Sequence, residues 1–181
     1  MPRGQGRFAY YDRLSAKDKA IYRRSDAIPR MPLPDVEALR PLVAALEAAL
    51  ATGKRARVAA ATRQLASQVF AQLGAPPTKI HVREIRPSSE EGELHGLYTF
   101  AAGGEPPQLE LWMRTAAKAE TVRFRTFLRT LVHEMGHHLD VTVLGLEESF
   151  HTEGFFRRES DLVRQLAPPP PRVPKKQLML F

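Results

Sequence analysis

The feature that most constrains this chain is the run Leu131-Val132-His133-Glu134-Met135-Gly136-His137-His138-Leu139-Asp140, which places the pattern H-E-x-x-H inside an apolar helical segment. An α-helix turns about 100° per residue, so His133 and His137 lie about 40° apart, with Glu134 on the flank of the pair. The apolar residues between positions 124 and 143 fall on another side of the same wheel. We therefore expect a helix that buries one flank and presents two imidazoles, one turn apart, to a single metal ion.

This arrangement indicates a particular chemistry. Neutral imidazole nitrogens bind Zn²⁺ at about 2.0–2.1 Å, and a carboxylate beside them can act as a general base without being a ligand. The pattern predicts a zinc site that hydrolyses peptide bonds, with His133 and His137 as ligands and Glu134 as the base. The alternative is a pair of surface histidines on an amphipathic helix. Gly136 argues against it, because a mid-helix glycine costs about 1 kcal/mol relative to alanine and indicates that another group approaches the backbone closely.

Composition limits what else the chain can do. There is no cysteine, so thiolate metal sites and disulfides are excluded, and a zinc ion must be held by His, Asp or Glu. The net charge of +7 is compatible with contact to DNA or another polyanion through a basic surface. The N-terminus lacks the apolar segment of a signal peptide, and no apolar run is long enough to span a membrane. We expect a cytoplasmic protein without membrane contact, and binding to DNA would place it at the nucleoid.

The order of segments predicts an α+β protein in three parts. Residues 1–34 form a short helix and an extended connector, residues 35–166 the folded domain, and residues 167–181 a proline-rich tether with a terminal interaction motif. Strand-like runs separated by turn-rich segments predict a small antiparallel three-stranded meander. These strands cover 79–86, 94–101 and 108–114, and the helices of the domain cover about 35–52, 54–73, 120–144 and 152–166.

Two histidines do not complete a catalytic zinc site, which usually has three protein ligands and one open position. The candidates downstream are Glu148, His151, Glu153, Glu159 and Asp161. The segment after His137 is long enough to reverse direction, so His151, at the start of the returning helix, would face the first helix. Glu159 lies deeper in that helix and remains the alternative ligand.

Other polar residues support two interpretations each. Asp140 either orients His137 from behind or is a solvated acid. Tyr98 either donates a hydrogen bond to a tetrahedral oxyanion or is a structural tyrosine of the sheet. His138 is expected at the edge of the core, and His81 and His95 are expected to be ordinary sheet histidines.

The motif and its surroundings resemble the SprT-like metallopeptidases of the Spartan type. In that family H-E-x-x-H is followed by a histidine that opens an H-x-x-x-F-aromatic helix, as His151-Thr152-Glu153-Gly154-Phe155-Phe156 does here, and the strand residues 95–98 and 109–112 are similar too. The likeness covers about residues 75–166. It implies a zincin-like fold with flanking helices, zinc held by His133, His137 and His151, and Glu134 as general base. It also implies that an edge strand, here residues 108–114, guides an extended peptide past the zinc.

The last five residues resemble a second known motif. Gln177-Leu178-x-Leu180-Phe181 is similar to the bacterial sliding-clamp-binding motif Q-L-x-L-F and follows a polyproline and lysine spacer. Leu178, Leu180 and Phe181 would be apolar anchors and Gln177 a hydrogen-bonding residue.

Spartan-type proteases act on proteins crosslinked to DNA and are tethered to a replication clamp. The two resemblances together imply a zinc endopeptidase of DNA-associated or DNA-crosslinked proteins. A general zinc peptidase without a DNA role and a non-enzymatic module in which zinc staples two helices remain the alternatives.

Overall fold

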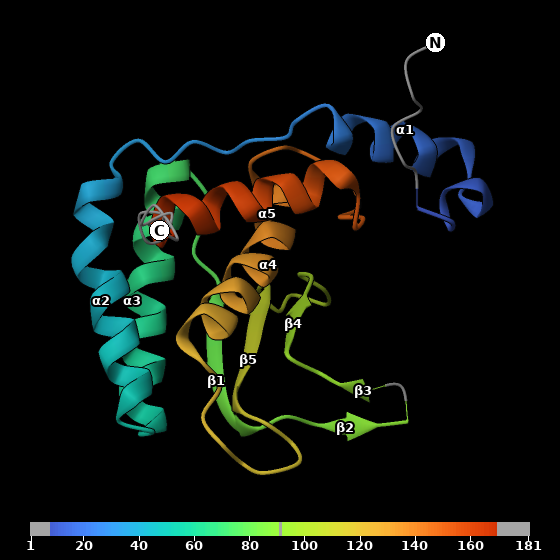
Figure 1. Ribbon diagram of the computed structural model, residues 1–181. Coiled ribbons are helices and arrows are strands. Elements are labelled where there is room, and N and C mark those ends of the chain that lie inside the picture. Colours follow the sequence, from blue (N-terminus) through green and yellow to red (C-terminus); the bar gives the residue numbers. More distant parts are fainter. Residues whose placement is uncertain (1–7, 91, 170–181) are drawn as a thin grey trace, which may run out of the picture.

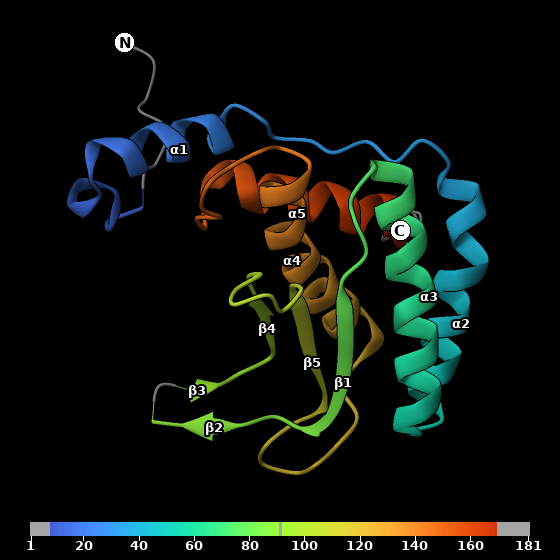
Figure 2. The ribbon, with the colours of Figure 1, turned by 180° about the vertical axis from the view of Figure 1, so that it is seen from behind.

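The described part of the chain combines five α-helices with a small mixed sheet (Figures 1 and 2). The structure is a computed structural model, and it describes residues 8–90 and 92–169. The chain is therefore α+β, as predicted. The elements in order are η1 (Tyr11–Arg13), α1 (Ala16–Asp26), α2 (Val36–Ala51), α3 (Arg55–Leu73), β1 (Lys79–Ile85), β2 (Ser88–Ser89), β3 (Gly92–Glu93), β4 (Gly96–Thr99), β5 (Gln108–Arg114), α4 (Phe124–Thr142) and α5 (Glu153–Leu166).

The strand order corrects the predicted meander. The sheet runs β1-β5-β4, with β1 parallel to β5 and β4 antiparallel to it. The chain between β1 and β4 leaves the sheet to form the separate β2-β3 hairpin, as both views show (Figures 1 and 2). β5 takes the centre because it carries the most strongly buried apolar run of the three strands. Residues 108–114 therefore do not form the edge strand that was predicted, and β4 forms the edge of the sheet on the α4 side.

Buried and more exposed residues alternate along the strands, and the helices cover the face that carries the buried ones. Leu109, Leu111 and Met113 of β5 are fully buried and belong to the same core cluster as Ile80 and Val82 of β1. The intervening positions of β1 are exposed or half-buried. This period of two directs one face towards α3 and α4 and leaves the other more open.

The helices begin where their capping residues predict. The Asp35 carboxylate accepts a hydrogen bond from the Ala38 amide (3.0 Å) and begins α2, and α3 ends at Gly74 in a left-handed conformation (φ 71°). Pro41 lies inside α2. α2 and α3 lie side by side, and α3 packs on β1 (Figures 1 and 2).

The two C-terminal helices position the motif residues. α4 packs on β4 and β5 with a buried apolar flank, and α5 packs on α4. At the crossing, a side chain on Gly136 would lie 3.1 Å from the ring of Phe155, so the glycine allows this close approach. α1 packs against α5. None of the helices in the described part of the chain is long and apolar enough to cross a bilayer. The predicted clamp-binding residues Gln177, Leu178, Leu180 and Phe181 lie outside the described residues.

Candidate metal centre

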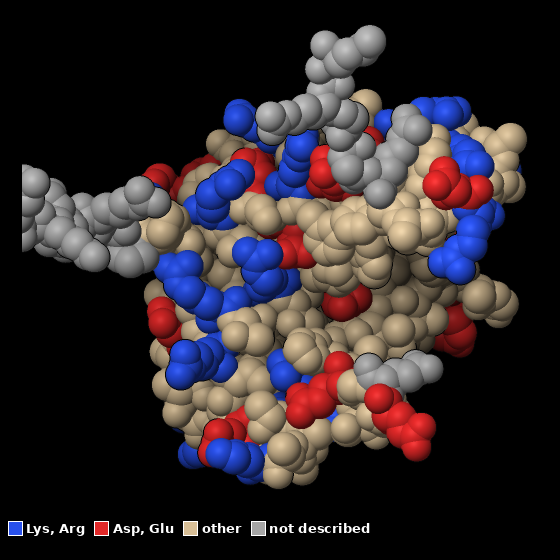
Figure 3. Space-filling view, turned by 45° about the vertical axis from the view of Figure 1, so that its right-hand side comes forward, with Lys and Arg blue, Asp and Glu red and all other residues tan. Residues whose placement is uncertain are grey.

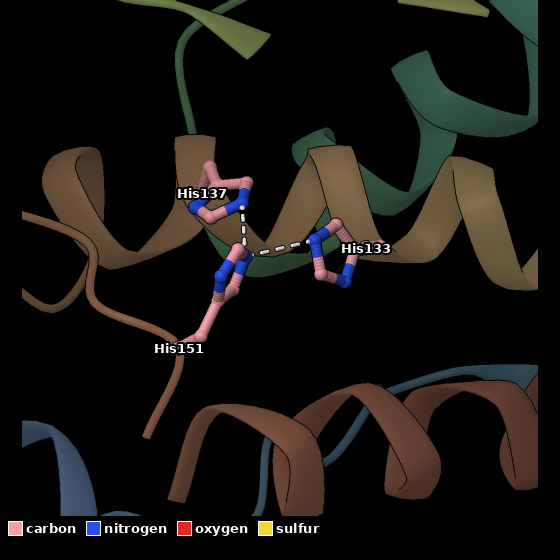
Figure 4. A group of neighbouring side chains, drawn as sticks. All are labelled: His133, His137 and His151. Carbon is pink, nitrogen blue, oxygen red and sulfur yellow. Dashed lines mark hydrogen bonds between the residues drawn. The ribbon is translucent and has the colours of Figure 1, made fainter. Parts of the chain in front are cut away.

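Three imidazoles from two parts of the chain meet at one point (Figure 4). His133 and His137 project from α4, and His151 reaches them from the segment before α5. The Nε2 atom of His151 lies 3.0 Å from that of His133 and 3.2 Å from that of His137. Three nitrogens bound to one tetrahedral ion at about 2.0–2.1 Å would lie about 3.3 Å apart. The observed spacing is therefore close to that of three ligands of a single ion.

The hydrogen bonds behind the rings determine which nitrogen faces the centre. The Nδ1 atom of His133 lies 2.9 Å from the Glu159 carboxylate, and that of His137 lies 2.8 Å from the hydroxyl of Ser149. Ser149 donates its own proton to Asp140 (2.9 Å), so it accepts from His137. Both Nδ1 atoms are thus donors, and both Nε2 atoms turn lone pairs towards the centre. This donor set fits a transition-metal ion.

Burial and mutual proximity keep two of these rings neutral. Burial, together with the neighbouring His133 and His151, lowers the pKa of His137 to about 3. The pKa of His151 is also lowered, first by burial and then by His133. Metal binding requires neutral imidazole, so these environments favour the ligand form.

The structure separates the two candidates for the third ligand. Among the described residues, the group close enough to hold an ion consists of His133, His137 and His151. Glu159 lies behind His133 and also pairs with Arg129 (2.6 Å). Glu148, Glu153 and Asp161 are not part of this group. Glu159 therefore lies behind His133 as its hydrogen-bond partner, outside the group that could hold an ion.

Asp140 joins the centre to the interior through a buried chain of polar groups. Its carboxylate accepts from Ser149, which accepts from His137, and forms an ion pair with Arg158 (2.8 Å). The side chains of Asp140 and Arg158 are 1% and 4% exposed, so this pair is removed from solvent. Arg158 also donates to the backbone carbonyl of Ser25 (2.7 Å). Asp140 is thus linked to His137 by two hydrogen bonds through Ser149, and of its two interpretations the solvated acid does not fit its burial.

Ser149, Arg158 and Arg129 surround the three histidines but were not predicted from the sequence. Serine and arginine are common on loops and helices, and no spacing in the sequence marks these three. Only the approach of the loop and α5 to α4 brings them behind the histidines.

Glu134 lies on the flank of the histidines and is buried against β4. A side chain on Gly96 would lie 2.5 Å from its carboxylate oxygen, so only glycine leaves room for the carboxylate here. Burial raises the pKa of Glu134 to about 7, opposed by His133 and by a backbone hydrogen bond from Tyr98. A carboxyl group with such a pKa can both accept and return a proton near neutral pH.

The structure places Tyr98 beside His138, with its ring stacked on that of His137 (centroids 6.2 Å apart). The Tyr98 hydroxyl lies 3.1 Å from Nδ1 of His138, whose Nε2 donates to the carbonyl of Pro76 (2.8 Å). His138 therefore accepts the tyrosine proton, which makes Tyr98 a structural residue in this arrangement and unavailable to an oxyanion. His138 is fully buried, deeper than the core edge where it was expected. His81 lies on β1, and His95 lines the groove beside the site.

Comparisons of the chain with family models, with curated proteins and with solved structures return no match. The likeness to SprT-like metallopeptidases thus rests on sequence motifs.

Proposed function

We propose that this protein is a zinc-dependent endopeptidase in which His133, His137 and His151 hold the ion and Glu134 is the general base. The observation that carries the proposal is the convergence of three imidazole nitrogens beside one buried carboxyl group. Three histidines leave the fourth position of a tetrahedral ion open, as catalytic zinc sites require. The proposed fold type is zincin-like, with α4 as the active-site helix.

The chemistry divides between the ion and the chain. Zn²⁺ in such a site supplies a Lewis acid that polarises a carbonyl and brings the pKa of water towards 7. Glu134 takes the proton of the attacking water and delivers it to the amine that leaves when the peptide bond breaks. Glu159 and Ser149 hold the rings of His133 and His137 in the tautomer that presents Nε2.

The surroundings of the site favour an enzyme over a zinc staple. A structural zinc site is closed by four protein ligands. Here His133 and Glu134 line an open groove of about 720 Å³, and His151 is exposed. A substrate therefore has access to the centre, which a staple would not need.

The decisive experiment compares two glutamates. The substitution Glu134→Gln is expected to keep one zinc per chain and to lower cleavage of an unfolded protein about 100-fold or more, because general base catalysis contributes roughly 10²–10⁴-fold. Glu153→Gln, whose carboxylate pairs with Arg157 on α5, is the control and should leave cleavage unchanged. A chelator should abolish cleavage by both active forms. Unchanged cleavage by Glu134→Gln, or no cleavage by the zinc-loaded wild type, contradicts the proposal.

We further propose that the C-terminal residues recruit the enzyme to a bacterial sliding clamp and hence to DNA-associated or DNA-crosslinked proteins. The support is the sequence Gln177-Leu178-x-Leu180-Phe181 at the end of a proline-rich segment, together with the net charge of +7. A peptide of residues 172–181 should bind a purified bacterial clamp, and the change Phe181→Ala should remove binding because it deletes an anchor. Absence of binding by the unchanged peptide favours a general zinc peptidase.

A further inference from the structure

The groove that leads to the metal centre runs along α4. α4 contributes residues at both ends of the groove, from Arg125 to Glu134, and the walls come from Glu93 to Gly96 on one side and from Phe156 and Glu159 of α5 on the other. Nine residue steps of α-helix correspond to about 14 Å. The groove is thus long enough for several residues of an extended peptide beyond the bond to be cleaved.

Two arginines lie in line with the metal ligands. Arg125, Arg129, His133 and His137 follow one another at intervals of four residues, so their side chains leave α4 on a common stripe. Each interval advances about 6 Å along the helix axis, and an extended peptide advances about 3.3 Å per residue. The spacing of the two guanidinium groups therefore equals that of side chains two residues apart in an extended peptide. Such side chains point to the same face of the peptide.

The charge of Arg125 is available to a ligand. Its guanidinium donates to the backbone carbonyls of Ala167 (3.2 Å) and Pro168 (3.1 Å), and no ion pair within the described part of the chain involves it. Neutral carbonyls hold the side chain in place without cancelling its charge. An arginine held in this way loses little conformational freedom when it binds a carboxylate.

Arg129 is partly available. It pairs with Glu159 at 2.6 Å, yet its side chain is 56% exposed. A guanidinium has five N–H donors, so one contact with Glu159 leaves others for a substrate. We expect a weaker contribution from Arg129 than from Arg125, because Glu159 already balances its charge.

Two of the three acidic residues that line the groove form ion pairs, and the third, Glu134, lies at the metal end. Glu93 pairs with the buried Arg86 (3.2 Å), and Glu159 pairs with Arg129. The end of the groove that is distant from the metal therefore carries the unmatched positive charge of Arg125. In the space-filling view of Figure 3, Lys and Arg atoms lie on the left-hand side and again at the upper right, with Asp and Glu atoms among them.

We infer that Arg125, assisted by Arg129, selects peptide substrates with acidic side chains at alternate positions on one side of the cleaved bond. This inference rests on the proposed peptidase function and adds a substrate class to it. One acidic position lies about two to three residues from the cleaved bond, next to Arg129, and the second lies two residues further, next to Arg125. A peptide fits the groove better than a nucleic acid strand, because its lining offers two arginines, one of them already paired with Glu159, which is too few to match a continuous phosphate backbone.

The test uses a series of fluorogenic peptides in which one Glu is moved through the five positions on each side of the cleaved bond, each with a Gln-containing partner. At the peptide position that contacts Arg125, we expect the Glu peptide to have a kcat/KM about five-fold higher than that of the Gln peptide. The difference should be smaller at the position two residues nearer the cleaved bond. The difference should fall on KM, because the arginines lie away from the reacting atoms. Equal rates for Glu and Gln at every position overturn the inference, whereas cleavage of the Gln peptides independently supports the peptidase function.

Substitutions assign the effect to one residue. Arg125→Gln keeps donors for the two carbonyls and should abolish the preference at the distant position, and Arg125→Glu should reverse it in favour of Lys. Arg123→Glu is the matched control, because Arg123 is an exposed arginine next to the groove that does not line it. Zinc content and the midpoint of thermal unfolding verify that each variant is folded. A preference for Glu over Gln that survives Arg125→Glu contradicts the inference. An Arg125 variant that loses binding to single-stranded DNA but keeps its peptide preference contradicts it as well.

Discussion

Each of the three histidines that could hold a metal ion is held by a different residue of the surrounding structure. Glu159 holds the ring of His133, Ser149 holds that of His137, and the hydroxyl of Tyr10 donates to the backbone carbonyl of His151 (2.8 Å). Partners of this kind fix the tautomer and direction of a ligating imidazole and typically account for about 10–100-fold in metal affinity. The three histidines are thus oriented before an ion arrives.

At this scale the first prediction concerns Ser149. The substitution Ser149→Ala removes the hydroxyl that accepts the His137 Nδ1 proton. We therefore expect the affinity for zinc to fall about ten-fold. Competition with a chromophoric chelator measures this change. Ser160→Ala on α5 is the control and should keep the affinity of the wild type. Equal affinities for all three proteins would show that the Ser149 hydroxyl does not orient the ligand.

The second prediction concerns the space beside Glu134. A methyl group in Gly96→Ala would lie 2.5 Å from the carboxylate oxygen and 2.8 Å from Cγ of Glu134, so the carboxylate has to move. A displacement of about 1 Å in a catalytic group can cost about 100-fold in rate, and we expect a loss of this order with zinc still bound. Thr99→Ala, at an exposed position of β4, should keep full activity. Full activity of Gly96→Ala would mean that the carboxylate does not need its observed position.

At the scale of elements, α1 braces the segment that carries His151. Arg24 donates to the carbonyl of Gly145 (2.7 Å) at one end of this segment, and Asp26 accepts from the amide of Gly154 (2.7 Å) at the other. α1 is far from α4 and α5 in sequence, yet its C-terminal turn packs against the start of α5. The position of the third ligand therefore depends on the docking of the N-terminal helix.

Two glycines of the helices test this dependence. A side chain in Gly154→Ala would lie 2.3 Å from the backbone oxygen of Ser25, whereas one in Gly136→Ala would lie 3.1 Å from the Phe155 ring. We expect Gly154→Ala to lower the free energy of unfolding by about 1–3 kcal/mol, since backbone cannot yield as a side chain can, and to weaken zinc binding. Gly136→Ala should change the free energy of unfolding less, because the higher helix propensity of alanine, about 1 kcal/mol, offsets the tighter contact with Phe155.

Urea unfolding and zinc competition measure both effects. Wild-type stability and zinc affinity in Gly154→Ala would show that α1 does not position His151.

At the scale of the whole molecule, an ion would join parts of the chain that otherwise meet through weaker contacts. The ligands come from α4 and from the segment before α5, which α1 holds in place. An ion that binds only the folded chain stabilises it by mass action. Stability and metal content should therefore rise and fall together.

We predict that zinc at about 100 times its dissociation constant raises the free energy of unfolding by about 2.7 kcal/mol, and that a chelator reverses the change. For a chain of this size, the unfolding midpoint should rise by about 5–10 °C. His151→Ala should show a much smaller rise, whereas Glu134→Gln should show the full rise because it keeps all three ligands. An equal rise in His151→Ala would exclude residue 151 from the metal site.

Local properties of this chain could be predicted from the sequence with good agreement. The helices at 36–51, 55–73, 124–142 and 153–166 begin and end within a few residues of their predicted bounds, and the Asp35 cap is where it was expected. The close approach at Gly136 is present as well, made by Phe155. These features depend on residues a few positions apart, so helical periodicity and capping determine them before the chain is folded.

Long-range features required the folded structure. These features depend on contacts between segments that are far apart in sequence or lie across a turn. They are the pairing of β1 with β5, the edge position of β4, the grouping of His151 instead of Glu159 with His133 and His137, and the hydrogen bonds from His137 through Ser149 to Asp140. An antiparallel meander fitted the same strand pattern, and Glu159, deeper in the helix that follows His151, remained the alternative ligand. The periodicity of a segment states which of its faces is apolar, but only packing against the rest of the molecule decides which neighbour covers that face.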